Sequence, residues 1–154
     1  MSTKKSQLKS HSHCVFQISY HIIFVTKCRR KCLTEPILKR LREILQEICD
    51  RWDVDLIEFG GESDHIQILV EVHPNVQPSK FVNSLKTLSS RYTRKEFAEH
   101  LAQYYWKPVL WTRAYCLLSA GGAPLSVIKK YIENQGDLKP EPHKYKLRNS
   151  SPPK

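Results

Sequence analysis

Alternating apolar and polar side chains near the N-terminus predict a half-buried β-strand over residues 14–25. Gln17, Ser19 and His21 fall on one face of this strand, because successive side chains of a strand point to opposite sides. The other face carries the apolar residues Phe16, Ile18, Tyr20, Ile22 and Phe24. We therefore expect the polar face to be available to a ligand.

Two amphipathic helices are predicted from apolar residues spaced three and four positions apart. The first begins after Thr34 with Pro36 in its first turn, and both residue types are common at helix starts. Its apolar stripe consists of Ile37, Leu41, Ile44, Ile48 and Trp52. The second helix is expected over residues 79–99, with the stripe Phe81, Leu85, Leu88 and Tyr92.

Further strands are predicted over residues 54–59 and 65–72, with a turn at Gly60-Gly61 between them. Residues 104–118 predict one or two more strands, and a short helix is expected to begin at Pro124 and to end at Gly136. The resulting order is strand, helix, strand, strand, helix, strand and an extra helix. This order is typical of an α+β, ferredoxin-like (split βαβ) domain, whose helices cover one face of an antiparallel sheet and leave the other free.

Length and composition exclude several classes of protein. The 154 residues are enough for one domain. We see no run of about 18 apolar residues to cross a membrane, and the polar N-terminal residues do not resemble a signal peptide. The five cysteines form no disulfide framework, and Cys28 and Cys32 lack the second close pair that a structural zinc site needs. We expect a folded domain over 13–138 between flexible tails at 1–12 and 139–154.

Positive charge points to a polyanionic ligand. The formal net charge is +10, and it is concentrated in residues 1–50 and 101–154, whereas residues 51–100 are slightly acidic. This distribution suits a nucleic acid bound around a chemical site, although basic tails or a soluble surface give the same composition. The loop after the first strand contains Lys27, Arg29, Arg30 and Lys31, which are candidates for phosphate contacts or simply a solvated loop.

A candidate metal site lies in the third predicted strand. His65 and Gln67 share one face of this strand, and an imidazole nitrogen and an amide oxygen at this spacing can bind one divalent cation. The alternative is an exposed polar strand face. Glu62 and Asp64 precede the pair, either as turn-forming acids or as partners that orient His65.

A candidate nucleophile lies in the last predicted helix. Tyr131 and Gln135 are four residues apart and therefore share a helix face. Tyrosine is a real though uncommon nucleophile, and Lys129 and Lys130 beside it can attract a phosphate. The alternative is a surface tyrosine on an amphipathic helix.

Four ordered blocks between about residues 13 and 136 resemble one family. They are YHIIFVTKCRRKCL, GGESDHIQILVEV, PSKFVNSLKTLSSRYTRKEF and LWTRAYCLLSAGGAPLSVIKKYIENQ. They resemble the small single-tyrosine transposases of the HUH nuclease class, from compact bacterial and archaeal insertion sequences, including the REP-associated tyrosine transposases. The last block is the most specific of the four.

The resemblance implies a DNA transposase that cleaves and rejoins single-stranded DNA at hairpin-bearing ends through a 5′-phosphotyrosine bond. Tyr131 matches the nucleophile, and His65 and Gln135 match metal ligands. Gln67 stands where the second motif histidine is usual, a change that favours Mg²⁺ or Mn²⁺ over zinc. The resemblance further implies a homodimer, with active sites shared between chains, in the cytoplasm of a prokaryote and at its nucleoid when bound to DNA.

Two functions from different classes remain open. The first is an active strand transferase, with the catalytic domain over 13–138. The second is a non-catalytic or repurposed nucleic-acid-binding relative with an impaired metal site. In both, we expect DNA contacts from the basic side chains Lys27, Arg29, Arg30, Lys31, Lys86, Arg91, Arg113, Lys129 and Lys130.

Overall fold

The computed structural model describes residues 9–11, 14–119 and 130–134. It contains a four-stranded sheet of β3 (Ser19–Val25), β4 (Asp55–Gly61), β5 (His65–Glu71) and β6 (Cys116–Ser119), in the order β4-β5-β3-β6. All three neighbouring pairs are antiparallel. Helix α1 (Glu35–Arg51) connects β3 to β4, and α2 (Pro78–Glu96) and the short α3 (Ala98–Leu101) lie between β5 and β6. The ferredoxin-like α+β prediction is confirmed.

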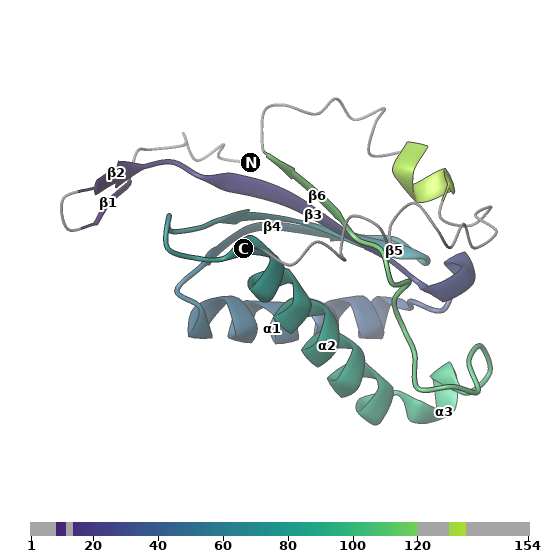
Figure 1. The fold of residues 1–154 in the computed structure, drawn as a ribbon. Helices are drawn as coiled ribbons and strands as arrows, with labels where there is room; N and C mark the ends of the chain where they lie inside the picture. The colour runs from purple at the N-terminus through teal and green to yellow at the C-terminus, as the bar shows by residue number, and fades with distance from the viewer. Residues whose placement is uncertain (1–8, 12–13, 120–129, 135–154) are drawn as a thin grey trace, which may run out of the picture.

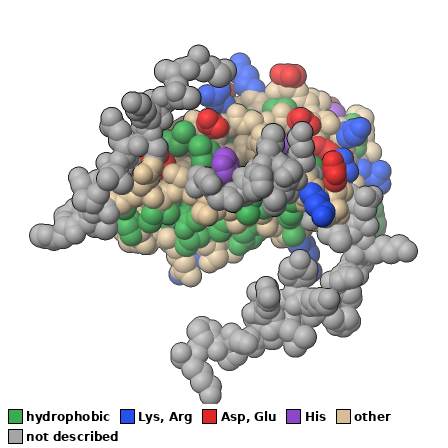
Figure 2. Space-filling view, turned by 90° about the horizontal axis from the view of Figure 1, so that it is seen from above, with side chains coloured by type: hydrophobic (Ala, Val, Ile, Leu, Met, Phe, Trp, Pro, Cys, Tyr) green, Lys and Arg blue, Asp and Glu red, His purple; other side chains and the backbone are tan. Residues whose placement is uncertain are grey.

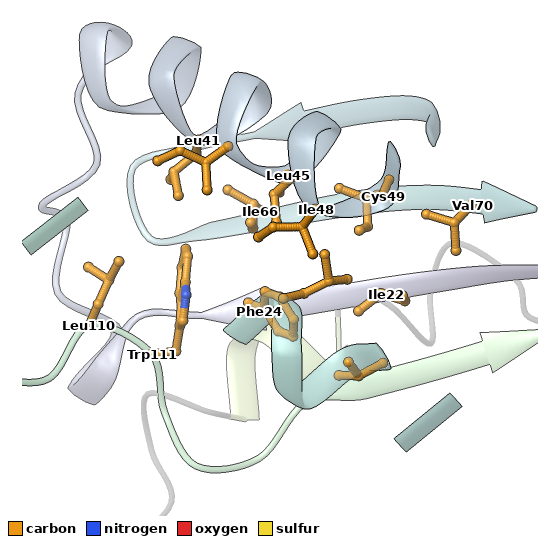
Figure 3. Close-up of a cluster of buried hydrophobic side chains, with 14 of the residues drawn as sticks. Ile22, Phe24, Leu41, Leu45, Ile48, Cys49, Ile66, Val70, Leu110 and Trp111 are labelled. Atoms are coloured by element: carbon orange, nitrogen blue, oxygen red, sulfur yellow. The ribbon is translucent and has the colours of Figure 1, made fainter. Parts of the chain in front are cut away.

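Helices α1 and α2 pack under one face of the sheet (Figure 1). The apolar positions of β5 point into this layer, where Ile66, Ile68 and Val70 are buried as their alternation predicts. Ile22 and Phe24 of β3 join them, together with Trp111, whose ring lies 5.6 Å from that of Phe24 (Figure 3). Burial of these side chains is the main driving force that holds the helices on this face.

A short hairpin precedes the sheet. Strand β1 (Lys9–His11), which the sequence places in the N-terminal tail, pairs antiparallel with β2 (Cys14–Phe16). The single strand predicted over 14–25 is therefore two strands, because the chain leaves regular pairing at residues 17–18. After β3 the chain forms a 3₁₀ turn, η1 (Lys27–Arg29).

The glycine pair does not form the predicted turn. Gly60 and Gly61 continue β4, and the reversal falls at residues 62–64, where the amide of Glu62 donates to the carbonyl of His65. A Cβ on Gly61 would lie 2.7 Å from Leu38 Cδ2 on α1. A side chain at this position would displace Leu38, so glycine favours close approach of the strand to the helix, and turn propensity does not decide the position.

Two other boundaries differ from the sequence prediction. The helix expected over 79–99 ends at Glu96, because Phe97 leaves helical geometry before α3 begins. Tyr92, expected on the buried stripe, is 36% exposed, whereas the polar Ser89 and Thr93 are buried. Of the segment 104–118, only residues 116–118 belong to a strand, β6, which extends to Ser119. Trp111 adds an isolated bridge to Thr26.

The second sheet face is not left free. Residues 130–134 are helical and lie on the side opposite α1 and α2 (Figure 1, yellow). Ile132 packs there against Ile23 and Val25, and Tyr131 packs against the same cluster. The C-terminal half of β3 is thus apolar on both faces, which is why simple alternation described only its N-terminal half. No helix among the described residues is long and apolar enough to cross a membrane.

Candidate active site

The register of the sheet brings the candidate metal ligands under the helical residues 130–134, which include Tyr131 and are called the tyrosine helix below. Val25 of β3 lies opposite His65, and Ile23 lies opposite Gln67. Residues directly opposite each other in an antiparallel pair project to the same face, with Cβ atoms about 4.5–5.5 Å apart. Tyr131 packs on the cluster formed by Ile23 and Val25. Tyr131 and the candidate ligands therefore share one patch of the sheet, although 66 and 64 positions of sequence separate Tyr131 from His65 and Gln67.

His65 is held in one orientation by Asp64. Its Nδ1 donates a hydrogen bond to Asp64 Oδ1 at 2.8 Å, and both side chains are buried to 9% exposure. Because the carboxylate can only accept, this bond favours the proton on Nδ1 and leaves the lone pair of Nε2 available to bind a metal ion. Of the two alternatives weighed for Asp64, the structure supports the orienting partner.

Asp64 is in turn held by Arg29. Arg29 Nε donates to Asp64 Oδ2 at 2.9 Å, and its Nη1 donates to the carbonyl of Glu133 at 3.3 Å. Burial alone would raise the pKa of Asp64, but the hydrogen bonds from His65 and Arg29 outweigh it and keep that pKa below its ordinary value. Arg29 therefore connects the tyrosine helix to the histidine through one charged side chain.

The backbone of the turn η1 directs Arg29 inward. Cys28 and Arg29 both have left-handed φ angles, 55° and 52°, which are unfavourable for side chains other than glycine. Thr26 holds this strained turn closed, because its hydroxyl donates to the carbonyl of Arg30 at 2.7 Å. The amide of Lys27 adds a bond to the carbonyl of Leu110. Strain stored at such a position is common next to functional groups.

Gln67 is exposed on the same face and lies over Gly60 of the neighbouring strand. A Cβ at Gly60 would lie 3.3 Å from Gln67 Nε2 and 3.4 Å from its Cγ. Glycine thus leaves room for the amide. From the sequence, Gly60-Gly61 was expected to form a turn. That Gly60 leaves room for the Gln67 side chain is revealed only by the pairing of β4 with β5.

The donor atoms present fit a hard divalent cation. Glu62, Asp64 and His65 each offer a ligand atom, and these atoms lie within 4.8 Å of one another. Asp64 already accepts from two partners, so the exposed Glu62 is the acid with capacity left for a ligand. One imidazole nitrogen, an amide oxygen and a nearby carboxylate suit Mg²⁺ or Mn²⁺ better than a thiolate-preferring metal. The Gln135 position lies outside the described residues.

The basic residues expected to contact DNA divide into two groups. Arg29 is engaged with Asp64, and Lys86 Nζ donates to the carbonyl of Arg113 at 2.6 Å. Burial, followed by the nearby charge of Arg113, lowers the pKa of Lys86. The exposed members are Lys27, Arg30, Lys31, Arg91, Arg113 and Lys130, and Lys129 lies outside the described residues. In Figure 2, basic and acidic side chains lie beside one another on the upper face.

Together these groups form a site suited to phosphate esters. A tyrosine hydroxyl lies on a sheet face with an oriented imidazole, carboxylates and surrounding positive charge. The Tyr131 side chain is half-buried, and its hydroxyl oxygen is shielded from solvent. A half-buried tyrosine beside an oriented histidine on a ferredoxin-like sheet is a candidate site for acting on phosphate esters, and the fold alone does not specify such a site.

Comparison with known proteins shows the family to which the chain belongs. The family model described as "Transposase IS200 like" matches residues 14–135, and the chain belongs to this family. It is 29% identical to the ISDra2 transposase TnpA of Deinococcus radiodurans over 131 residues, covering 85% of this chain and 93% of the relative. It is 30% identical to the IS200 transposase of Salmonella typhimurium over 127 residues, covering 82% of each.

Solved structures agree with this assignment. A crystal structure of a protein from Deinococcus radiodurans, described as "a putative transposase", has 31% sequence identity and a TM-score of 0.76. The match covers 82% of this chain and 97% of that one. A REP-associated tyrosine transposase bound to a REP hairpin has a TM-score of 0.50 at 8% identity, covering 81% and 68% of the two chains. The second similarity concerns the fold alone.

Proposed function

We propose that this transposase cleaves and rejoins single-stranded DNA through a covalent bond to Tyr131. The proposal rests on the packing of the Tyr131 helix on Ile23 and Val25, the strand partners of Gln67 and His65. Family membership supports a role in DNA transposition. The chemistry, the metal and the single-stranded substrate belong to the proposal.

In the proposed reaction, Tyr131 Oη attacks a phosphodiester phosphorus. The new Oη–P bond gives a 5′-phosphotyrosine, and the P–O3′ bond breaks to leave a free 3′-hydroxyl. A tyrosine phenol in water has a pKa of about 10, so the proposed attack requires loss of the phenolic proton, and in the net reaction the departing 3′-oxygen gains one. Because the phosphotyrosine conserves the energy of the broken bond, a second 3′-hydroxyl can reverse the step and rejoin DNA.

The other residues orient the reacting groups. Asp64 holds the ring of His65, and His65 Nε2 and the Gln67 amide would hold a divalent cation, with Gln135 as the third ligand expected from the resemblance. Such a cation stabilises negative charge on a phosphate oxygen. Arg29 keeps Asp64 charged and contacts the tyrosine helix through the carbonyl of Glu133. The exposed basic side chains around the turn η1 supply positive charge for the DNA backbone.

The experiment is covalent capture of a labelled strand. A single strand labelled at its 3′ end is incubated with protein and Mg²⁺ or Mn²⁺, and the label is followed on a denaturing protein gel. Wild type should become labelled, whereas Tyr131→Phe should not, because only the attacking hydroxyl is lost. Tyr92→Phe, which removes a hydroxyl from α2, is the matched control and should label normally. Labelling of Tyr131→Phe would exclude Tyr131 as the nucleophile.

Gln67 favours a second candidate function. Since a histidine is usual at this position, a weakened metal site would give a DNA-binding protein without cleavage activity. The same assay separates the two functions: binding without covalent labelling by wild type supports the second. If Gln67→His then restores labelling, the natural protein is a disabled transposase.

We further propose that the protein acts as a homodimer on hairpin-bearing DNA ends, in the cytoplasm and at the nucleoid. The REP-associated neighbour, which shares the fold, is bound to a REP hairpin. The catalytic domain is proposed to span residues 13–138, with flanking segments at 1–12 and 139–154, of which Lys9–His11 pair with β2. Within the described residues, Ile132 packs on Ile23 of its own chain. If the sites are shared between chains, Ile132 would instead pack on the Ile23 side chain of the other chain.

Mixing two inactive variants tests whether each active site combines residues from both chains of the dimer. Tyr131→Phe and His65→Ala chains are each expected to be inactive. If tyrosine and histidine come from different chains, mixed dimers regain one composite site and become labelled. If mixed dimers form but stay unlabelled, each site lies within one chain.

A further inference from the structure

A small hollow lies beside the turn η1, outside the candidate active site. It lies between this turn and the loop that follows α3, and its volume is about 210 Å³. That is smaller than the roughly 300–1,000 Å³ of typical cofactor and drug sites, so it suits a single ring system better. We refer to it as the Trp106 platform, defined by Lys27, Arg30, Tyr104, Tyr105, Trp106 and Lys107.

Trp106 is the most exposed large hydrophobic side chain among the described residues. Its exposure is 90%, against 39% for Ile57 and 36% for Tyr92. A side chain with this exposure contributes little to the hydrophobic core. Its indole ring is exposed to solvent and is available to stack against a planar ligand. Lys107 Nζ lies over the Trp106 ring, 5.1 Å from its centroid, so positive charge lies against one face of the indole.

The wall of the hollow is fixed before any ligand arrives. The hydroxyl of Tyr105 donates to the carbonyl of Lys27 at 2.7 Å, and the amide of Lys27 donates to the carbonyl of Leu110 at 2.8 Å. These bonds tie the aromatic loop to the turn η1. A preorganised wall lowers the entropic cost of binding.

Charge identifies the kind of ligand. Three of the eight lining residues are basic, namely Lys27, Arg30 and Lys107, and none is acidic. Aromatic rings flanked by Lys and Arg are the combination that binds single-stranded nucleic acid, because bases stack on the rings and phosphates meet the cations. An acidic peptide would use the charge but has no need of an open indole.

We propose that the Trp106 platform binds one unpaired base of the DNA strand by stacking on Trp106, with Lys27, Arg30 and Lys107 contacting the adjoining phosphates. This inference takes its ligand class from the proposed function. The inference specifies where on the protein a base binds relative to the candidate active site. The turn η1, which lines the platform, also carries Arg29, whose guanidinium contacts Asp64. A strand that leaves the candidate active site past this turn reaches the platform directly.

The test compares a dT 15-mer with an abasic 15-mer that keeps the phosphates but lacks bases. Wild type should bind dT more tightly. Trp106→Ala should weaken dT binding roughly 5- to 150-fold, the range for losing one stacked base, and leave abasic binding unchanged. Trp106→Phe should retain much of the dT preference, because it keeps a ring. Tyr92→Ala is the control for loss of an exposed aromatic side chain elsewhere.

Two results would overturn the proposal: unchanged dT binding by Trp106→Ala, or an equal loss on both probes. Covalent labelling at saturating DNA separates this proposal from the proposed function. If Trp106→Ala becomes labelled but binds dT like wild type, the platform is refuted and the function stands. If wild type is never labelled but Trp106→Ala loses the dT preference, the platform is supported and the strand-transfer function is refuted.

Discussion

Replacing Arg29 tests whether this side chain holds the candidate site together. Arg29→Met keeps the length and packing of the side chain but removes its bonds to Asp64 Oδ2 and to the carbonyl of Glu133. Arg30→Met is the matched control: it removes the same charge from the next residue, whose side chain is exposed. Any effect on long-range attraction of DNA is common to both variants.

The expected loss of stability lies between two limits. Breaking a fully buried ion pair costs about 3–5 kcal/mol, whereas an exposed pair contributes about 0–1 kcal/mol. The Asp64 side chain is 9% exposed and the Arg29 side chain 35%, and Asp64 keeps its bond to His65. We therefore expect Arg29→Met to lower the free energy of unfolding by about 1–2 kcal/mol. For a domain of this size, the melting temperature should fall by roughly 2–8 °C.

Two measurements check the prediction. Urea unfolding gives the stability difference, and covalent labelling of a 3′-labelled strand gives activity. Because partners that orient metal ligands typically contribute 10–100-fold, labelling by Arg29→Met should slow by about that factor. Arg30→Met should unfold like wild type and lose only DNA affinity. If the two variants have equal stability and equal labelling rates at saturating DNA, Arg29 is only another surface cation and the reasoning is wrong.

Three further predictions follow from the same site and fold. Gln67→Ala should slow labelling about 10–100-fold, whereas Gln67→His should be tolerated, because imidazole replaces the amide as a ligand. Equal labelling rates for wild type and Gln67→Ala would show that Gln67 is not a ligand. DNA affinity should fall steeply with rising salt, because each phosphate contact releases counterions. The slope of log affinity against log salt concentration should be smaller in Lys27→Ala and Lys31→Ala. Affinity that does not change with salt in a filter-binding assay would contradict this prediction. Burial raises the pKa of the Cys49 thiol to about 12, so iodoacetamide at pH 8 should alkylate the exposed Cys28 and spare Cys49 until the protein unfolds, as peptide mass spectrometry would show.

The candidate site was only partly predictable from the sequence. The positions of His65 and Gln67 on one strand face follow from the period of two, and Asp64 could be proposed as a partner because it adjoins His65. The function of Arg29 could not be predicted. A basic loop resembles a phosphate-binding surface, and nothing in the local pattern indicates that one guanidinium points inward to a residue 35 positions away.

Local periodicity predicted the main helices and strands of this protein, although it missed β1 and the break at residues 17–18. The alternation of Ile66, Ile68 and Val70 and the helical spacing of Ile37, Leu41 and Ile44 each predict which side is buried, because that information lies within a few neighbouring residues. Only the tertiary structure decided that Gly61 packs against α1, that Ile132 covers Ile23, and that Arg29 reaches Asp64. These contacts join distant segments through the register of the sheet, and a one-residue shift in register would place a different side chain under the tyrosine helix.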